Sequence, residues 1–201
     1  GPSNLVAVAI SGDVVVAGAY GDSSISTGVG SAYVFCTSDG GDTYNQVAKL
    51  TADDVTNGFG YSVAIDGATV VAGAPYDDDD GTNSGAAYVF LVPRTSSWPQ
   101  LAKMVASDAA ASDYFGGSVA ASGDLVAVGA YGDDSYTGSV YILQVDSSAA
   151  AYTQLVKLTA DDATAGDNFG YSVAIDGESV VIGAPGFSGA VYVLRTTDGG
   201  A

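Results

Sequence analysis

Histidine is absent from the 201-residue sequence, and cysteine occurs once, as Cys36. A Ser-His-Asp triad, a Cys-His pair, histidine general-base chemistry and ordinary zinc sites are therefore excluded within one chain, as is an intramolecular disulfide. Cys36 lies at the end of an apolar run, and we interpret it as an inert thiol, although an odd cysteine leaves intermolecular pairing open.

Basic residues are scarce: five Lys and Arg stand against 23 acids, which gives a net charge of −18. Nucleic acid and anionic membrane surfaces require clustered positive charge, so both are excluded as partners. No apolar run approaches the roughly 18 residues that a membrane-spanning helix needs, and no signal peptide is visible in this chain. Because a hydrated acidic surface suits a saline or extracellular environment, we expect a secreted or cell-surface protein.

Glutamate is almost missing as well: Glu178 is the only one, so the other 22 of the 23 acids (23 minus 1) are Asp. Glu favours helix interiors, whereas Asp favours turns and caps. Together with 28 Gly, this choice of acid indicates strands joined by tight turns, with essentially no helix.

Internal repetition is the strongest positive signal in the sequence. The segment YSVAIDG at 61–67 recurs at 171–177, with related copies at 117–123 and 6–12. Each copy is followed by a second apolar run that ends in Gly-Ala-Pro or Gly-Ala-Tyr, and then by a third run containing Tyr. The final residues of the second runs are spaced 55, 56 and 54 residues apart, and these residues are Tyr20, Pro75, Tyr131 and Pro185.

Each repeat contains β-type runs separated by Gly and Asp, which predicts antiparallel strands. Asp66-Gly67 between the first two runs indicates a type I′ hairpin turn, and the equivalent slots hold Gly12-Asp13, Gly123-Asp124 and Asp176-Gly177. Four strands in a unit of this length are typical of a β-propeller blade. The residues that we expect to be buried in these blades are Val63, Ile65, Val119, Val173 and Ile175.

The predicted fold is therefore all-β: a single propeller domain or propeller segment over 1–201, with blade units at about 5–58, 59–114, 115–168 and 169–201. Three units supply four strands each and the last supplies three, which makes 15 strands (3 × 4 + 3). An open stack would expose apolar faces at its two ends. Three outcomes stay open: part of a larger propeller, four blades that close alone, or association with another chain.

Three units begin with the same dipeptide, as Phe59-Gly60, Phe115-Gly116 and Phe169-Gly170, and two hairpins end in Gly-Ala-Pro. In these motifs the whole chain resembles the FG-GAP repeat family, known from the propeller of integrin α subunits, and specifically its short-hairpin branch. The resemblance implies a β-propeller, usually of about seven blades, used outside the cell for binding and adhesion. The first unit departs from the pattern, because Asn4-Leu5 stands where Phe-Gly belongs.

Four consecutive acids on one predicted loop, Asp77, Asp78, Asp79 and Asp80, form the candidate metal site. Adjacent carboxylates repel one another unless a cation or solvent intervenes, which suggests a Ca²⁺ loop with an affinity on the order of 10⁻⁴–10⁻³ M. The alternative is a solvated acidic turn, because the D-x-[DN]-x-[DN]-G frame is absent and integrin-type Ca²⁺ loops lie in the first hairpin. Weaker equivalents in other units are Asp22, Asp133 and Asp134.

Other polar and aromatic residues recur with the repeat. A second acidic series precedes each Phe-Gly, and we interpret it as turn architecture rather than a cation site. The lysines at one repeat position either form an anion-binding ring or, as we favour, pair with Asp of the Thr-Ala-Asp-Asp segment just beyond. Aromatics on the outer strands either cover the strand edge or stack on a ligand. The three sets are Asp53, Asp54, Asp108, Asp113, Asp161, Asp162 and Asp167; Lys49, Lys103 and Lys157; and Tyr44, Trp98 and Tyr152.

These patterns favour a non-catalytic binding or assembly module that presents propeller loops to a protein or glycan, or that joins further blades. The alternative is a glycan-active hydrolase or lyase that uses paired Asp carboxylates. Catalytic pairs are normally unique, whereas the acids of this sequence recur with the repeat, so we predict that the protein is not an enzyme.

Overall fold

The computed structural model describes residues 7–23, 29–54, 57–92, 98–186 and 189–195. Asn4, Leu5 and Phe187 lie outside this part of the chain. The described strands are β1 (Ala7–Ser11), β2 (Val14–Ala19), β3 (Ser31–Cys36), β4 (Asn45–Leu50), β5 (Ser62–Asp66), β6 (Thr69–Ala74), β7 (Ala86–Leu91), β8 (Gln100–Met104), β9 (Phe115–Ser122), β10 (Leu125–Ala130), β11 (Ser139–Asp146), β12 (Ala151–Leu158), β13 (Ser172–Asp176), β14 (Ser179–Ala184) and β15 (Ala190–Arg195).

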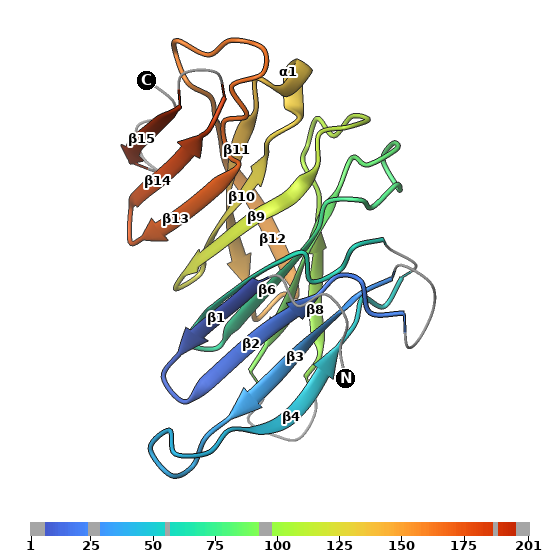
Figure 1. Cartoon of the computed structure of the whole chain (residues 1–201), viewed down its shortest axis with the longest axis vertical. Coiled ribbons are helices and arrows are strands. Elements are labelled where there is room, and N and C mark those ends of the chain that lie inside the picture. Colours follow the sequence, from blue (N-terminus) through green and yellow to red (C-terminus); the bar gives the residue numbers. More distant parts are fainter. Residues whose placement is uncertain (1–6, 24–28, 55–56, 93–97, 187–188, 196–201) are drawn as a thin grey trace.

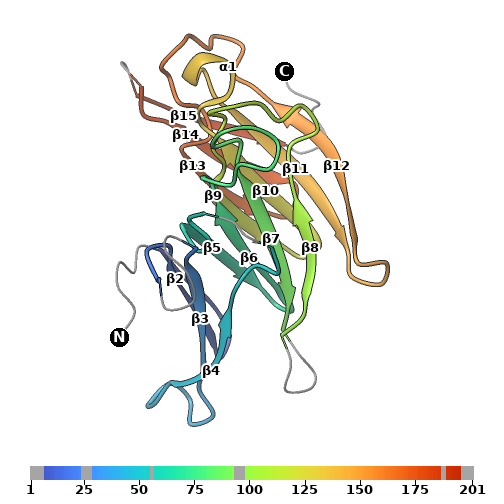
Figure 2. The same ribbon diagram turned by 90° about the vertical axis from the view of Figure 1, so that its right-hand side faces the viewer.

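The strands form four antiparallel sheets in sequence order, which we call blades 1 to 4: β1–β4, β5–β8, β9–β12 and β13–β15 (Figure 1). The all-β propeller prediction and the count of 15 strands are thus confirmed. The described strands do not close into a ring. Blade 1 and blade 4 lie at opposite ends of the stack, as both views show (Figures 1 and 2), so four blades closing alone is not the arrangement of this structure.

Helix is nearly absent from the described residues. The one short element, α1 (Asp133–Tyr136), contains Asp134 and Ser135 at φ values of 47° and 62°, so its backbone is left-handed rather than α-helical. No helix among the described residues has the length and apolar character needed to cross a membrane.

The turns between the first two strands hold the predicted residue pair in blades 1 and 3, Gly12-Asp13 and Gly123-Asp124, but not in blades 2 and 4. Asp66 pairs with Thr69 across the hairpin, so the two turn residues are Gly67 and Ala68 rather than Asp66 and Gly67. Gly67 has a φ of 53°, whereas Ala68 has no positive φ. Glycine at the first turn position alone is the pattern of a type II′ turn, not of the predicted type I′ turn. Asp66 and Asp176 are therefore the last residues of their strands.

Successive blades pack through three apolar clusters, one between each neighbouring pair. The Phe of each Phe-Gly is fully buried and forms a parallel bridge with a glycine of the preceding blade: Gly30 with Phe59, Gly85 with Phe115, and Gly138 with Phe169. The following glycine brings its carbonyl oxygen against a glycine on the second strand of the preceding blade. A Cβ at Gly18, Gly73 or Gly129 would lie 2.1, 2.0 or 2.0 Å from that oxygen.

Hydrogen bonds repeat along the same interfaces. The Ser62 hydroxyl donates to the Gly116 carbonyl at 2.8 Å, and Ser118 donates to Gly170 at 2.7 Å. At the hairpin turns, the N–H of a turn glycine donates to a side chain of the preceding blade. The accepting side chain belongs to the last residue of that blade's first strand. These bonds are Gly67 to Ser11 at 3.2 Å, Gly123 to Asp66 at 2.7 Å and Gly177 to Ser122 at 3.0 Å.

The predicted core is buried except in blade 4. Val63, Ile65 and Val119 are buried as predicted. Val173 and Ile175 contact blade 3 but are only half-buried, so their prediction was wrong in degree. The reason is that the first strands of blades 2 and 3 lie between two described blades, whereas β13 has a described neighbour on one side only.

Candidate functional site

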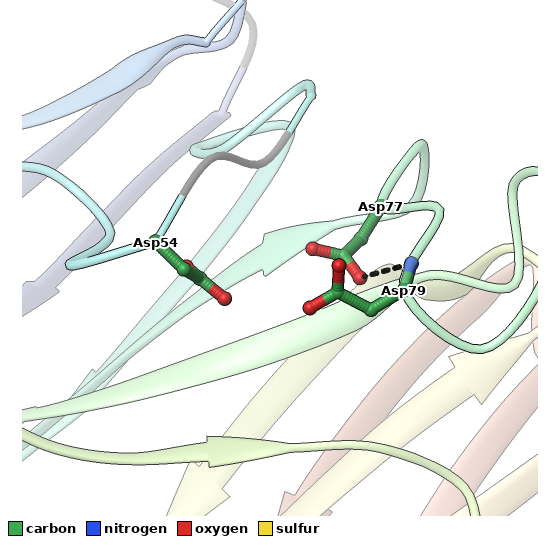
Figure 3. A group of neighbouring side chains, drawn as sticks. All are labelled: Asp54, Asp77 and Asp79. Atoms are coloured by element: carbon green, nitrogen blue, oxygen red, sulfur yellow. Dashed lines mark hydrogen bonds between the residues drawn. The ribbon is translucent and has the colours of Figure 1, made fainter.

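One edge of the blades, which we call the loop edge, collects most of the polar residues that the sequence singled out. Antiparallel order brings together the start of each first strand, the end of each second strand and the end of each fourth strand. In blade 2, Asp77 and Asp79 follow β6, while Tyr88 on β7 and Lys103 on β8 are directly paired across the two strands. Asp54 reaches this group from the segment after β4 of blade 1 (Figure 3).

A lysine ammonium lies at the centre of this blade 2 cluster. Lys103 Nζ is 2.8 Å from Asp54, 3.0 Å from Asp77 and 2.6 Å from Asp79. The Tyr88 hydroxyl lies 3.0 Å from Asp54 Oδ1 and 3.1 Å from Asp77 Oδ2, and the ammonium is 5.6 Å from the centre of the same ring. Because Asp54 comes from the preceding unit, the cluster joins two blades.

The same arrangement recurs in blades 1 and 3. In blade 1, Lys49 pairs with Asp22 at 2.9 Å, and the hydroxyl of Tyr33 donates to that carboxylate. In blade 3, Lys157 pairs with Asp108 at 2.7 Å and with Asp133 at 2.6 Å. The Tyr141 hydroxyl donates to Asp108, and in blade 4 Tyr192 donates to Asp162. In blades 2, 3 and 4, the aspartate that precedes the blade thus accepts a hydrogen bond from the tyrosine of that blade's third strand.

The prediction that the lysines pair with aspartates is confirmed, but for Lys103 and Lys157 the predicted partner was wrong. Lys103 binds Asp54 and Lys157 binds Asp108, so these two lysines reach the acid before their own blade rather than the Asp just beyond them, whereas Lys49 binds Asp22 within its own blade. The physical reason is that the segment between blades places its aspartate at the edge of the next blade where the third strand begins and the fourth strand ends. An anion-binding ring is not supported, because these ammonium groups are already occupied by carboxylates.

The charges in blade 3 shift one another's pKa values. Burial alone would raise the pKa of the Asp108 carboxyl, but hydrogen bonds from Lys157 and Tyr141 outweigh it and hold that pKa below its usual range. Burial alone would lower the pKa of Lys157, and its bonds to Asp108 and Asp133 hold it above its usual range instead. Both partners are therefore charged at neutral pH.

These directions predict how the Asp108–Lys157 pair depends on pH. A depressed carboxyl pKa contributes stability above the unfolded value of about 3.9, and this contribution is lost as the pH falls through the folded value. The difference in melting temperature between the wild type and Lys157→Met should therefore stay constant from about pH 5 to 9 and shrink in acid. Thermal melts at a series of pH values measure it. A difference that grows below pH 4 would contradict the ion pair.

The four predicted metal ligands of blade 2 do not act as a set. Asp77, whose side chain is 1% exposed, and Asp79 join the lysine cluster. Asp78 instead accepts the Asn83 N–H at 2.7 Å, and Asp80 is exposed and outside the group. Sequence reasoning placed the third member, Asp54, among the turn residues. The carboxylates of Asp54, Asp77 and Asp79 lie within 4.8 Å of one another and could hold a metal ion.

The two weaker candidate metal ligands of blade 3, Asp133 and Asp134, also lie in different environments. Asp133 is buried, pairs with Lys157 and accepts a hydrogen bond from Ser139. Asp134 is exposed in the left-handed turn.

The turn role predicted for the second acidic series is confirmed at two positions. Asp113 accepts the Ala110 N–H at 2.7 Å, and Asp167 accepts the Thr164 N–H at 2.7 Å. Burial raises the pKa of Asp113, which borders a surface hollow of about 590 Å³ together with Asp133 and Tyr136. Asp113 and Asp133 are a candidate for the predicted carboxylate pair, yet both acids have equivalents in other blades and are already hydrogen-bonded within the fold.

The outer-strand aromatics have structural roles in blades 2 and 3. Trp98 packs against the apolar cluster between blades 1 and 2. The Tyr152 hydroxyl accepts the Val105 N–H at 3.3 Å, which ties β12 to the segment after β8. Cys36 is half-buried, and burial raises its pKa, which agrees with the predicted inert thiol.

A row of tyrosines along the loop edge of the blades was not predicted from the sequence. Neighbouring ring centres are 5.0–6.2 Å apart, and the row crosses all four blades. Tyr136 and Tyr171 are the most exposed, at 42% and 55%. The signal was present, because six of the seven flank the Phe-Gly or Gly-Ala motifs. The row consists of Tyr20, Tyr61, Tyr76, Tyr114, Tyr131, Tyr136 and Tyr171.

Comparison with known proteins supports the repeat assignment. The model of the FG-GAP repeat matches three times, at residues 44–90, 98–143 and 152–194. Each match combines an outer strand with the first three strands of the next blade. The crystal structure of Saccharomyces cerevisiae Sqt1 is similar in fold, with a TM-score of 0.60 and 12% identity. The similarity covers 98% of this chain and 46% of that one, so the chain spans about half of its length. A search of curated proteins finds no match.

Proposed function

Because the chain belongs to the FG-GAP repeat family, we propose that it is a non-catalytic, secreted or cell-surface binding and assembly module. The tyrosine row is the observation that carries this proposal. It offers a continuous aromatic strip across four blades, beside the acidic loops that follow the second strands. Its partner is a protein or glycan that lies along the strip.

The chemistry of the strip suits both kinds of partner. Tyrosine rings present an apolar face that stacks on sugar rings or on side chains, and a hydroxyl that bonds to polar groups. The carboxylates of Asp78 and Asp80 are exposed nearby and can accept hydrogen bonds from hydroxyl or amide groups. The neighbouring lysine–aspartate clusters stabilise the blades, so the acids available for a catalytic pair are used within the fold.

The two exposed tyrosines provide the test. The purified chain should bind members of glycan or peptide arrays, and Tyr136→Ser with Tyr171→Ser should weaken that binding at least about tenfold, the equivalent of 1.4 kcal/mol. Tyr44→Ser is the matched control, because Tyr44 is 41% exposed but lies outside the row. Cleavage of a glycan by the chain, lost on changing Asp113, would instead support the glycan-active enzyme.

Calcium is a second candidate ligand, favoured by the group of Asp54, Asp77 and Asp79. Ca²⁺ would replace the Lys103 ammonium among three carboxylates, with an affinity on the order of 10⁻⁴–10⁻³ M. At 1 mM Ca²⁺, one to ten times this dissociation constant, one site adds about 0.4–1.4 kcal/mol to stability. Millimolar Ca²⁺ should therefore raise the melting temperature, and Mg²⁺ should do less.

Two variants distinguish the calcium site from general charge screening. Asp79→Asn should abolish the gain, whereas Asp80→Asn should leave it unchanged, because only Asp79 belongs to the group. If Ca²⁺ and a chelator give the same melting curve for the wild type, Lys103 is the only cation that this site accommodates.

A further inference from the structure

Tyrosine is the main oxidisable side chain on the surface of this protein. The sequence holds 13 Tyr but no His, and only one each of Trp, Met and Cys. Met104 is fully buried, and Trp98 and Cys36 are half-buried. A one-electron oxidant that reaches the described surface therefore meets mainly tyrosines, and seven of them form the row along the loop edge.

The row passes from blade to blade through pairs of tyrosines, one pair at each of the three joints between described blades. Within blades 2 and 3, further ring contacts with centres 5.7 and 5.0 Å apart link these pairs to one another. Contacts this short allow an electron to transfer between neighbouring rings, so the vacancy left by oxidation of one tyrosine can move along the row. The joint pairs, with the distances between their ring centres, are Tyr20 and Tyr61 at 5.4 Å, Tyr76 and Tyr114 at 6.1 Å, and Tyr131 and Tyr171 at 5.5 Å.

Two of the joint pairs have the geometry that covalent coupling requires. Two oxidised tyrosines couple through the ring carbons beside the hydroxyl-bearing carbons, so the edge of one ring must reach the other ring. Tyr20 and Tyr61 have ring planes at 66°, and Tyr131 and Tyr171 have planes at 54°. These are the closest pairs of the row that are not stacked in parallel.

The one closer pair, Tyr114 and Tyr131, is arranged unfavourably for coupling. Its rings are parallel to within 2°, so they present faces rather than edges to each other. The backbone also restricts them, because a Cβ at Gly132 would lie 2.7 Å from the Tyr114 ring and a Cβ at Gly117 would lie 2.7 Å from the Tyr131 ring. These rings have little room to turn, and Tyr131 therefore couples to its neighbour in the next blade.

We infer that the tyrosine row is a site of oxidative cross-linking, in which dityrosine bonds form at Tyr20–Tyr61 and at Tyr131–Tyr171 and join neighbouring blades covalently. The oxidant is of the one-electron class, such as a haem peroxidase supplied with hydrogen peroxide. This modification goes beyond the proposed binding function and does not depend on it.

The chemistry of the step is balanced by the peroxide. Each tyrosine loses one electron and its hydroxyl proton and becomes a phenoxyl radical. The two radicals form one carbon–carbon bond, and the hydrogens on the two bonded ring carbons are replaced by hydrogens on the oxygens, which restores both phenols. In sum, two tyrosines and one hydrogen peroxide give one dityrosine and two waters. Movement of the vacancy along the row brings two radicals, formed at different rings, to the same pair.

Trypsin distinguishes bonds at the joints from bonds within a blade. It cuts after Lys49, Arg94, Lys103 and Lys157. The partners of each joint pair therefore fall on different peptides, whereas Tyr114 and Tyr131 stay on one peptide, 104–157.

The experiment treats the full chain with a haem peroxidase and limiting hydrogen peroxide, at a concentration low enough to keep copies apart. The monomer should lose hydrogen atoms in pairs and gain dityrosine fluorescence. Mass spectrometry should find peptide 1–49 linked to 50–94, and peptide 104–157 linked to 158–195. The cross-linked monomer should also melt at least about 5 °C above the untreated chain, because a bond between distant residues restricts the unfolded chain as a disulfide does.

Phenylalanine variants identify the tyrosines, because phenylalanine keeps the ring but lacks the hydroxyl group. Tyr61→Phe should abolish the first link and Tyr171→Phe the second, and each should leave the other link intact. Tyr44→Phe is the matched control, since Tyr44 is 41% exposed but lies outside the row, and it should change neither link. The inference is wrong if dityrosine forms only within peptide 104–157, if the links survive the two variants, or if the only product is a dimer of two copies.

Discussion

Gly73→Ala is expected to destabilise the chain by about 3 kcal/mol, the upper end of the range for overpacking. The added methyl group would lie 2.0 Å from the Gly116 carbonyl oxygen, which belongs to the backbone of the next blade and cannot rotate away. Blades 2 and 3 would have to separate. For a chain of this length, that loss lowers the melting temperature by about 6–12 °C. Differential scanning calorimetry measures the shift.

The matched control is the same substitution at the equivalent glycine of blade 4, which faces no other described blade. Gly183→Ala places its methyl group only against the Ser172 hydroxyl, a side chain that can change rotamer. Its melting temperature should therefore stay close to that of the wild type. Equal destabilisation by the two variants would show that these glycines matter for the strand itself and not for contact between blades.

Lys103→Met is expected to cost about 3 kcal/mol, because removing one partner of a buried pair leaves an uncompensated charge. The carboxylate of Asp77 is 1% exposed and would keep only the Tyr88 hydroxyl and a backbone N–H near its oxygens. The side chain of Lys103 is itself 21% exposed, which places the expected loss at the lower end of the range for fully buried pairs. Chemical denaturation at neutral pH measures this loss.

Arg195→Met provides the control for the change in net charge. Arg195 is exposed at the end of β15, so its loss makes the chain equally more acidic without opening a cluster. We expect its stability to change by less than about 0.5 kcal/mol. A similar loss for both variants would mean that overall repulsion, rather than the joint between blades, determines the effect.

The fold could be predicted because each repeat carries the same local signals. Apolar runs of strand length and turn glycines recur at the same positions in each repeat, and three repeats begin with Phe-Gly. All of these signals predict the same four-stranded blade. The turn type could not be predicted from the sequence. Asp66 is a residue that favours turns, but in this structure it ends a strand and accepts a hydrogen bond from Gly123 of the next blade. Local propensity describes one hairpin, whereas this choice depends on the neighbouring blade.

The sequence predicted that the lysines form ion pairs with aspartates, but it did not predict which aspartate each lysine contacts. The common register of Lys49, Lys103 and Lys157 indicated ion pairs, yet the partner of Lys103 is Asp54, 49 residues earlier. Sequence proximity favoured the acids just beyond each lysine. Only the path of the connecting segment over the next blade explains why the earlier aspartate is in reach. The tyrosine row depends on the same stacking of blades, because its members come from four different blades.

The distance between equivalent turns in blades 1 and 4 tests the open stack most directly. Spin labels at Asp13 and Glu178, in a Cys36→Ser background, report this distance by pulsed electron resonance. Labels at Asp13 and Ala68 report the distance between adjacent blades, and all three positions are exposed turn residues. The open stack predicts a distinctly longer distance for Asp13 and Glu178 than for Asp13 and Ala68. Equal distances would show that blade 4 closes onto blade 1, and would contradict it.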